Sequence, residues 1–463
     1  MTRVVIVGGG PGGYEAALVA AQLGADVTVV DRDGLGGSAV LTDCVPSKTL
    51  IATSEVMTLT AESDQLGVRI GDGSPGEGGV SVDLAAVNSR VKRLAAAQSA
   101  DIVNRLEREG VRIVTGLGRL EGPSVVTATE AGGRSHAFPA DAVLVATGAR
   151  PRIVAGAEPD GERILTWEQV YDLDVLPSRL IVVGSGVTGA EFASAYDGLG
   201  SDVVLVSSRD HVLPGEDPDA AQVLEDVFRR RGMEVLSRSR AQTVQRTEGG
   251  VLVTLADGRT VEGSHCLMAV GSLPNTEGIG LVESGVTLTD AGYVQVDRVS
   301  RTSARGVYSA GDVTGVLMLA SVAAMQGRVA MWHALGDAVK PLDLKSVSSN
   351  VFTDPEIATI GVTQADIDAG REDARTIKLP LATNARAKMQ GITDGFVKLF
   401  ARPGTGVVVG GVVVAPKASE LIFPITLAVA HRLTVDDVAG SFTVYPSLTG
   451  SIAEAARQLH THG

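Results

Sequence analysis

The stretch Val4-Val5-Ile6-Val7-Gly8-Gly9-Gly10-Pro11-Gly12-Gly13 decides how this chain folds. A short apolar strand runs into a turn with the pattern G-x-G-x-x-G, an alanine-rich helix follows over residues 14–23, and a second strand ends at Asp31. In such a pattern Gly8 permits the tight turn, Gly10 lets the backbone approach a pyrophosphate, and Gly13 allows helix and strand to pack closely. The helix N-terminus then faces the phosphates, and Asp31 can accept a hydrogen bond from a ribose 2′-OH.

The same pattern returns in the middle of the chain, with a strand over residues 180–183 and the turn Gly184-Ser185-Gly186-Val187-Thr188-Gly189. Two such folds predict two bound dinucleotides. The second copy lacks the acid of the first, because Ser207 stands at that position and Arg209 follows it. Without a carboxylate the site can accept the 2′-phosphate of NADPH, so the sequence favours NADPH and permits NADH. Arg209 is then either a phosphate partner or an ordinary surface charge.

The remaining segments define the domain organisation. Strands are predicted to end in the glycine turns Ala146-Thr147-Gly148, Ala269-Val270-Gly271 and Ala310-Gly311-Asp312. From residue 347 onward, strands over 395–400 and 407–415 and helices over 420–431 and 451–459 contain no phosphate-binding turn. The fold class predicted is therefore α/β, with two Rossmann-like dinucleotide-binding domains and a C-terminal α+β domain. The predicted domains are 1–150 with 276–346, then 151–275, then 347–463.

Composition limits the classes of function. The chain has 463 residues, of which 44% are hydrophobic, and a net charge of −14 with only 3% aromatic residues, which argues against nucleic-acid binding. The two cysteines, Cys44 and Cys266, cannot build a secreted disulfide framework. Cys266 lies in an apolar strand and is expected in the core. We find no signal peptide, no transmembrane segment and no metal-binding pattern, so we expect a soluble cytoplasmic protein.

A redox motif and several other segments carry a family resemblance. Cys44-Val45-Pro46-Ser47-Lys48 resembles the redox segment of the pyridine nucleotide-disulfide oxidoreductases, the family of dihydrolipoamide dehydrogenase and glutathione reductase. The likeness covers essentially the full length, since it extends to both glycine turns, Gly311-Asp312 and Val351-Phe352-Thr353-Asp354-Pro355-Glu356. It implies that the first domain holds FAD, the second holds NAD(P)H, and the third forms a homodimer interface.

The resemblance also implies roles for individual residues. Lys48 would lie near the N5 edge of the flavin and pair with Glu191, close to the nicotinamide. Ala320 would lie near the pyrimidine edge. The cofactor-binding residues implied by the turns and the likeness together are Gly8, Gly10, Gly13, Asp31, Lys48, Thr147, Gly148, Gly311, Asp312 and Ala320 for FAD, and Gly184, Gly186, Gly189, Arg209 and Gly271 for the nicotinamide coenzyme.

Two departures from the family pattern matter most. The family has two cysteines separated by four residues, and Cys44 matches the second of them. The position of the first is Ala39, so the segment cannot form a dithiol couple. The family also has a His, contributed by the partner subunit as the general acid and base for the dithiol, and a Glu that orients it. This chain has Tyr445 and Gly450 at these two positions. A Tyr with a pKa of about 10 is a poor base at neutral pH.

These departures predict a flavoprotein that works without disulfide chemistry. Their combination resembles the NAD(P)H:quinone reductase branch of the family. The expected reaction passes a hydride from NAD(P)H to FAD, and then electrons to a small-molecule quinone. Lys48 and Glu191 are the residues expected to tune the flavin. Cys44 is either a thiolate that contacts the flavin or a packing residue, and Tyr445 either lines the acceptor site or fills vacated volume.

Two alternatives stay open at this point. Soluble transhydrogenases, which move a hydride between NADPH and NAD⁺, resemble this family and also have an incomplete cysteine pair. A slow-turnover redox-sensing flavoprotein that signals by binding a partner is the other alternative. Rapid reduction of a thio-NAD analogue would favour the first, and slow turnover with every acceptor would favour the second.

Overall fold

The computed structural model describes residues 1–69 and 80–460. Residues 70–79 of the predicted first domain and residues 461–463 of the predicted third domain therefore lie outside the described part. No helix within the described ranges is both long and apolar enough to cross a membrane.

The chain divides into two compact units. The first unit contains Met1–Ser47, Asn88–Arg152 and Gly271–Asp343, and the second contains Lys48–Val87, Ile153–Val270 and Leu344–Gly463. The chain thus changes unit at residues 152 and 270, close to the ends of the 151–275 domain expected from the sequence. The segment Lys48–Val87, expected in the first domain, belongs to the second unit.

The first unit is built on a parallel sheet in the order β18-β7-β1-β2-β3. Its elements, with two helices that run on into the second unit, are β1 Arg3–Val7, α1 Pro11–Gln22, β2 Asp26–Asp31, α2 Gly37–Leu41, α3 Cys44–Ala61, α4 Leu84–Arg108, β3 Arg112–Thr115, β4 Leu117–Leu120, β5 Val125–Thr129, β6 Ser135–Pro139, β7 Ala142–Val145, β8 Ala149–Pro151, β17 Ser272–Pro274, β18 Val307–Ser309, η3 Asp312–Thr314 and α7 Ala320–Ala334.

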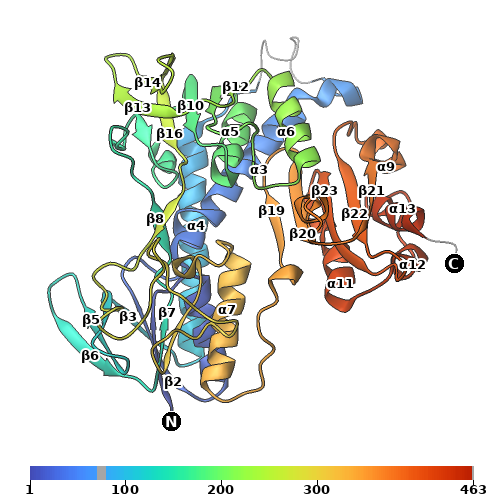
Figure 1. Cartoon of the computed structure of the whole chain (residues 1–463). Helices are drawn as coiled ribbons and strands as arrows, with labels where there is room; N and C mark the ends of the chain where they lie inside the picture. Colours follow the sequence, from blue (N-terminus) through green and yellow to red (C-terminus); the bar gives the residue numbers. More distant parts are fainter. Residues whose placement is uncertain (70–79, 461–463) are drawn as a thin grey trace. The chain divides into compact units, whose positions relative to one another are not determined.

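The two faces of this sheet bury alternate residues of its strands, as a parallel sheet covered on both sides requires. Val4 and Ile6 of β1 pack against helices α1 and α7, whereas Val5 and Val7 pack against the antiparallel sheet β4-β5-β6. In Figure 1, α7 and the strands β5 and β6 lie on opposite sides of β7. The first unit therefore has three layers.

The second unit repeats this plan with a parallel sheet in the order β12-β11-β10-β16-β9 and an antiparallel sheet β13-β14-β15. Alternate residues of β10 and β11 pack against β13 and β14, as in the first unit. The elements of this part are η1 Ser63–Leu66, β9 Ile164–Leu165, η2 Val170–Asp172, β10 Arg179–Val183, α5 Val187–Leu199, β11 Asp202–Val206, α6 Pro218–Arg230, β12 Glu234–Leu236, β13 Ala241–Arg246, β14 Val251–Leu255, β15 Thr260–Gly263 and β16 His265–Met268.

The C-terminal module belongs to the same unit and contains an antiparallel sheet in the order β19-β20-β23-β22-β21. Strand β23 lies in the middle of this sheet, as its apolar sequence favours. In Figure 1 this sheet is drawn in orange to red, with α11 and α13 beside it. The elements are η4 Leu344–Ser346, β19 Ser348–Val351, β20 Glu356–Gly361, α8 Gln364–Asp368, β21 Arg375–Pro380, η5 Leu381–Thr383, α9 Ala385–Met389, β22 Phe396–Ala401, β23 Val408–Ala415, α10 Ala418–Leu421, α11 Phe423–His431, α12 Val435–Gly440 and α13 Gly450–Leu459.

The predicted fold class is confirmed, with two corrections to predicted helices. The helix expected over residues 14–23 begins at Pro11, because proline at the first helical position costs no hydrogen bond. The helix expected over 420–431 is interrupted, since α10 ends at Leu421 and α11 begins at Phe423. Pro424 in the first turn of α11 has no N–H to donate to the preceding turn.

Candidate active site

The first glycine-rich turn has the shape that a pyrophosphate site requires. Gly8 has φ of 105°, and a Cβ on Gly13 would collide with the carbonyl oxygen of Gly8. A Cβ on Gly10, in contrast, would approach only the Cα of Gly37, at 3.9 Å. Gly8 and Gly13 are therefore required by the fold itself, whereas the space at Gly10 is open for a ligand.

Asp31, predicted to accept from a ribose, also organises the loop that follows β2. One carboxylate oxygen accepts from the backbone N–H of Gly9 at 2.6 Å, and the other accepts from Asp33 and Gly34 at 2.8 and 2.7 Å. A carboxylate offers about four acceptor positions, so one remains for a hydroxyl group. The residue therefore fits a dinucleotide while holding the turn and the loop together.

Four other predicted residues follow strands of the same sheet. Because the strands are parallel, the carboxyl ends of β1, β7 and β18 meet at one edge, which is where ligands bind in such sheets. Thr147 and Gly148 follow β7, and the Thr147 hydroxyl donates to the carbonyl of Asn275 at 2.7 Å. Asn275 returns a bond to the Thr147 carbonyl at 2.9 Å. The sequence offered no signal for Asn275.

Gly311 and Asp312 follow β18 at this edge. Gly311 has φ of 84°, and its N–H donates to the buried side chain of Gln326 at 2.8 Å, a residue for which the sequence offered no signal. Burial, with a smaller contribution from the nearby Asp43, raises the pKa of Asp312 to about 6. A buried carboxyl group is stabilised when a polar group of a ligand forms a hydrogen bond with it. Ala320 is exposed at the first position of α7.

The redox segment forms two consecutive helices. Ala39 lies in α2, and Cys44 is the first residue of α3 and is partly exposed. Neither Cys44 nor Cys266 is in a disulfide. Cys266 is fully buried in β16, and this burial raises the pKa of its thiol. The expectation that Cys266 is a core residue is therefore confirmed.

Lys48 and Glu191 form an ion pair within the second unit. The Lys48 ammonium lies 2.7 Å from one oxygen of the Glu191 carboxylate. The other oxygen accepts from the backbone N–H of Phe352 at 2.9 Å, and the ammonium lies 4.8 Å from the centre of the Phe352 ring. Glu191 is 5% exposed and Lys48 is 29% exposed, so both charges are partly removed from water. Phe352 lies within a motif that the sequence singled out, but its contact with this pair was not foreseen.

The second glycine-rich turn repeats the geometry of the first. Gly184 has φ of 112°, a Cβ on Gly189 would collide with the Gly184 carbonyl, and a Cβ on Gly186 would meet nothing within 4 Å. At the end of β11, the buried Ser207 hydroxyl lies 2.7 Å from that of Ser185. The nearby side chain of Arg209 is exposed.

The two remaining predicted residues, Gly271 and Tyr445, belong to neither turn. Gly271 belongs to the first unit, where its carbonyl accepts from the N–H of Arg152 at 2.9 Å and its φ is 92°. Tyr445 is 85% exposed, in the segment before α13, between the exposed Val444 and a cis bond to Pro446. Within this chain Tyr445 therefore fills no interior volume.

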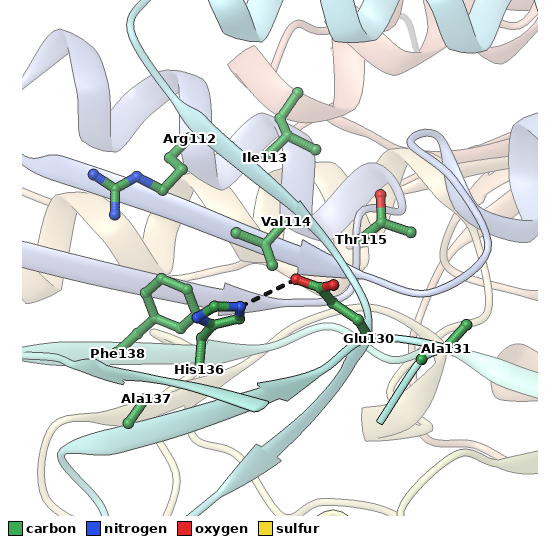
Figure 2. A pocket seen from close by; sticks show the side chains of 10 residues that line it. Arg112, Ile113, Val114, Thr115, Glu130, Ala131, His136, Ala137 and Phe138 are labelled. Carbon is green, nitrogen blue, oxygen red and sulfur yellow. Dashed lines mark hydrogen bonds and ion pairs between the residues drawn. The ribbon is translucent and has the colours of Figure 1, made fainter. Parts of the chain in front are cut away.

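A groove of about 740 Å³ lies along the free edge of β3 in the first unit. Figure 2 shows its lining from β3 and from the β5–β6 hairpin, with His136 and Glu130 paired at 3.1 Å. None of the residues that line it was predicted as a site residue. We assign this groove no part in the reaction proposed below.

Comparisons with known proteins agree with this architecture. Residues 2–327 match the model of the pyridine nucleotide-disulphide oxidoreductases, and residues 347–456 match the dimerisation domain of the same family. A curated protein of Mycobacterium tuberculosis, NAD(P)H dehydrogenase (quinone), is 57% identical, covering 100% of this chain and 94% of that protein. Dihydrolipoyl dehydrogenase of Bacillus subtilis is 32% identical, covering 98% of this chain and 97% of that protein.

The solved structures include a crystal structure of LpdA from Mycobacterium tuberculosis, which superimposes with a TM-score of 0.94 at 57% identity and covers 100% of both chains. The family resemblance inferred from the motifs is thus confirmed by sequence and by structure. The chain belongs to the pyridine nucleotide-disulphide oxidoreductase family.

Proposed function

We propose that this protein is an FAD-dependent NAD(P)H:quinone oxidoreductase that works without a redox-active disulfide. The observation that carries the proposal is the combination of two intact dinucleotide turns with Ala39 in place of the first redox cysteine. The 57% identity to a protein named NAD(P)H dehydrogenase (quinone) supports it. In this reaction NAD(P)H gives up a hydride, which is two electrons and one proton, and becomes NAD(P)⁺. The quinone takes up the two electrons and two protons, the second from solvent, and leaves as the hydroquinone.

The family uses FAD and NAD(P)H, and the first unit fits FAD. Gly8, Gly10 and Gly13 would hold the pyrophosphate, and Asp31 would accept from the adenosine ribose. The other holding residues would be Thr147, Gly148, Gly311, Asp312 and Ala320. When bound, the flavin supplies the two-electron chemistry between nicotinamide and acceptor.

The second glycine turn would hold the nicotinamide coenzyme, with Gly184, Gly186 and Gly189 at its pyrophosphate. Arg209 would contact a 2′-phosphate. Gly271, which follows directly after the segment Ile153–Val270, would allow the chain to pass close to the coenzyme. Lys48 would bring a positive charge to the reaction, and Glu191 would orient that charge.

Three features argue against thiol chemistry. Ala39 removes the partner of Cys44, Tyr445 replaces the family's His, and Gly450 replaces the Glu that orients it. Cys44, in the first turn of α3, would lie beside the cofactor, where it is either a thiolate that contacts the flavin or a packing residue. Tyr445, exposed on the dimerisation domain, is proposed to line the acceptor site in a homodimer.

The match of residues 347–456 to the dimerisation domain supports a homodimer. The exposed side chains of Phe442, Val444 and Tyr445 give this module an apolar surface that a second copy could cover. We propose the cytoplasm as the compartment, since two cysteines cannot build a secreted disulfide framework.

A steady-state acceptor screen tests the proposed function. Purified protein, with bound FAD checked by its absorption spectrum, is assayed with NADH and NADPH against a benzoquinone, a naphthoquinone, lipoamide, oxidised glutathione and thio-NAD⁺. We expect rapid turnover with the quinones and little with the disulfides. Protein that lacks flavin, or that reduces lipoamide as fast as quinones, would contradict the proposal. Fast reduction of thio-NAD⁺ alone would indicate a transhydrogenase.

The Ala39→Cys variant is expected to stay inactive with dihydrolipoamide. The new thiol would supply the missing sulfur, but Tyr445 and Gly450 would still provide no acid and base for it. The measurement is dihydrolipoamide oxidation with NAD⁺, alongside quinone reduction by the same preparation. Efficient dihydrolipoamide oxidation by this single variant would show that Tyr445 is no obstacle to thiol chemistry.

A further inference from the structure

The sequence pattern of dinucleotide-binding folds places an acidic residue at the end of β11, where it would recognise the coenzyme. This chain has Ser207 there, and its hydroxyl is not available for that recognition. The Ser207 hydroxyl, which is 0% exposed, lies 2.7 Å from the Ser185 hydroxyl. It also accepts from the backbone N–H of Arg209 at 3.1 Å and donates to the Arg209 carbonyl at 3.3 Å. Because these partners satisfy Ser207, recognition of the adenosine ribose must come from neighbouring residues.

A second stretch of main chain lies beside this strand end. The segment 237–239 follows β12, and the N–H of Arg238 donates to the Arg209 carbonyl at 2.8 Å. The N–H of Ser239 donates to the Ser207 carbonyl at 2.7 Å. Arg209 and Arg238 are therefore held on hydrogen-bonded neighbouring backbones, at the edge where the second dinucleotide turn lies.

The two arginines differ in their charge partners. Arg238 Nε lies 2.6 Å from a carboxylate oxygen of Asp210, with the two side chains 79% and 64% exposed. Among the described residues, Arg209 has no acidic side chain within ion-pair distance. An ion pair as exposed as that of Arg238 contributes little free energy, so another anion can replace Asp210 at small cost.

We propose that Arg238 is a second arginine of the subsite for the 2′-phosphate of NADPH, and that Asp210 is its exchangeable counter-ion. This inference rests on the proposed function only in placing the nicotinamide coenzyme at the second glycine turn. A phosphate monoester carries up to two negative charges near neutral pH, and two guanidinium groups can neutralise them by charge-assisted hydrogen bonds.

The arrangement also explains how one site can take both coenzymes. With NADPH, the 2′-phosphate takes the place of Asp210 beside Arg238. With NADH, Asp210 stays paired with Arg238, so Arg238 keeps its counter-ion at the empty phosphate position. Arg238 therefore adds affinity for NADPH without losing its charge partner when NADH binds.

Binding of two nucleotide fragments tests the proposal without any electron acceptor. Isothermal titration calorimetry on the FAD-loaded protein compares adenosine 2′,5′-bisphosphate with adenosine 5′-monophosphate. We expect Arg238→Ala to weaken binding of the bisphosphate by about tenfold and to change binding of the monophosphate much less. Added salt should weaken the bisphosphate complex more in the wild type than in the variant, since one charge contact is gone.

Arg240→Ala is the matched control, because Arg240 is an exposed arginine two residues further along the same segment. Equal effects of Arg238→Ala and Arg240→Ala on the bisphosphate would overturn the proposal, as would a wild type that binds both fragments equally well. Asp210→Asn should tighten bisphosphate binding severalfold by removing the competing carboxylate. Weaker or unchanged binding in that variant would show that Asp210 is no exchangeable counter-ion. A failed quinone assay would leave all these results unaffected.

Discussion

Replacement of Lys48 by Met is expected to slow reduction of the bound flavin by NAD(P)H by about 100-fold, the usual size of the loss when one preorganised charge is removed from a reaction centre. The ammonium is positioned by two contacts, the Glu191 carboxylate at 2.7 Å and the Phe352 ring at 4.8 Å. Without the ammonium, the Glu191 carboxylate keeps its hydrogen bond from the Phe352 N–H but loses its positive partner. The measurement is stopped-flow absorbance of the flavin under anaerobic conditions.

Two further variants separate charge from packing. Lys48→Arg keeps the positive charge and is expected to lose much less activity than Lys48→Met. Glu191→Gln keeps the Phe352 contact but removes the ion pair, and is expected to fall between the wild type and Lys48→Met. If Lys48→Met reduces its flavin at the wild-type rate with an unchanged melting temperature, the charge has no part in the reaction.

The Gly189→Ala variant is expected to raise the KM for NAD(P)H by at least about 100-fold while the protein keeps its FAD. The added Cβ would meet the backbone carbonyl of Gly184, which cannot move without opening the turn that faces the pyrophosphate. The equivalent change in the first unit, Gly13→Ala, should instead prevent FAD from being retained, since its Cβ would meet the Gly8 carbonyl. The two variants thus assign one cofactor to each turn.

Flavin absorbance and nucleotide titration of the same preparations measure both effects. Gly249→Ala, whose Cβ would meet nothing within 4 Å, is the control for a glycine outside the turns. Circular dichroism separates loss of the fold from loss of a ligand. If Gly189→Ala loses FAD and Gly13→Ala loses the coenzyme instead, the assignment of the two turns is reversed.

The parallel sheets could be predicted because each glycine turn links a strand to a helix in a fixed geometry. Only glycine fits at Gly8, Gly13 and their counterparts Gly184 and Gly189, because a Cβ there would collide with the backbone. Such a requirement is visible in the sequence pattern itself. The antiparallel sheets β4-β5-β6 and β13-β14-β15 were not predicted as sheets. Their strands are short, and their pairing depends on the face of the parallel sheet that they cover.

Beyond the glycine turns, most of the site could be predicted only through the family resemblance. That resemblance implied the pairing of Lys48 with Glu191, and the structure places the two side chains 2.7 Å apart across 143 residues of chain. Contacts made by the main chain do not depend on the type of side chain, so the sequence does not indicate them. Phe352 donates its backbone N–H to Glu191, and Asp31 accepts from three backbone N–H groups that any residue except proline could have supplied.

The bond from the Phe352 N–H to Glu191 has a consequence for how this family can diverge. Every amino acid except proline carries that N–H, so substitutions at position 352 can accumulate without releasing the carboxylate. A comparison of related sequences would then score the position as variable although the contact persists in each of them. Only a substitution by proline, which has no backbone N–H, would remove this hydrogen bond and so reveal its importance.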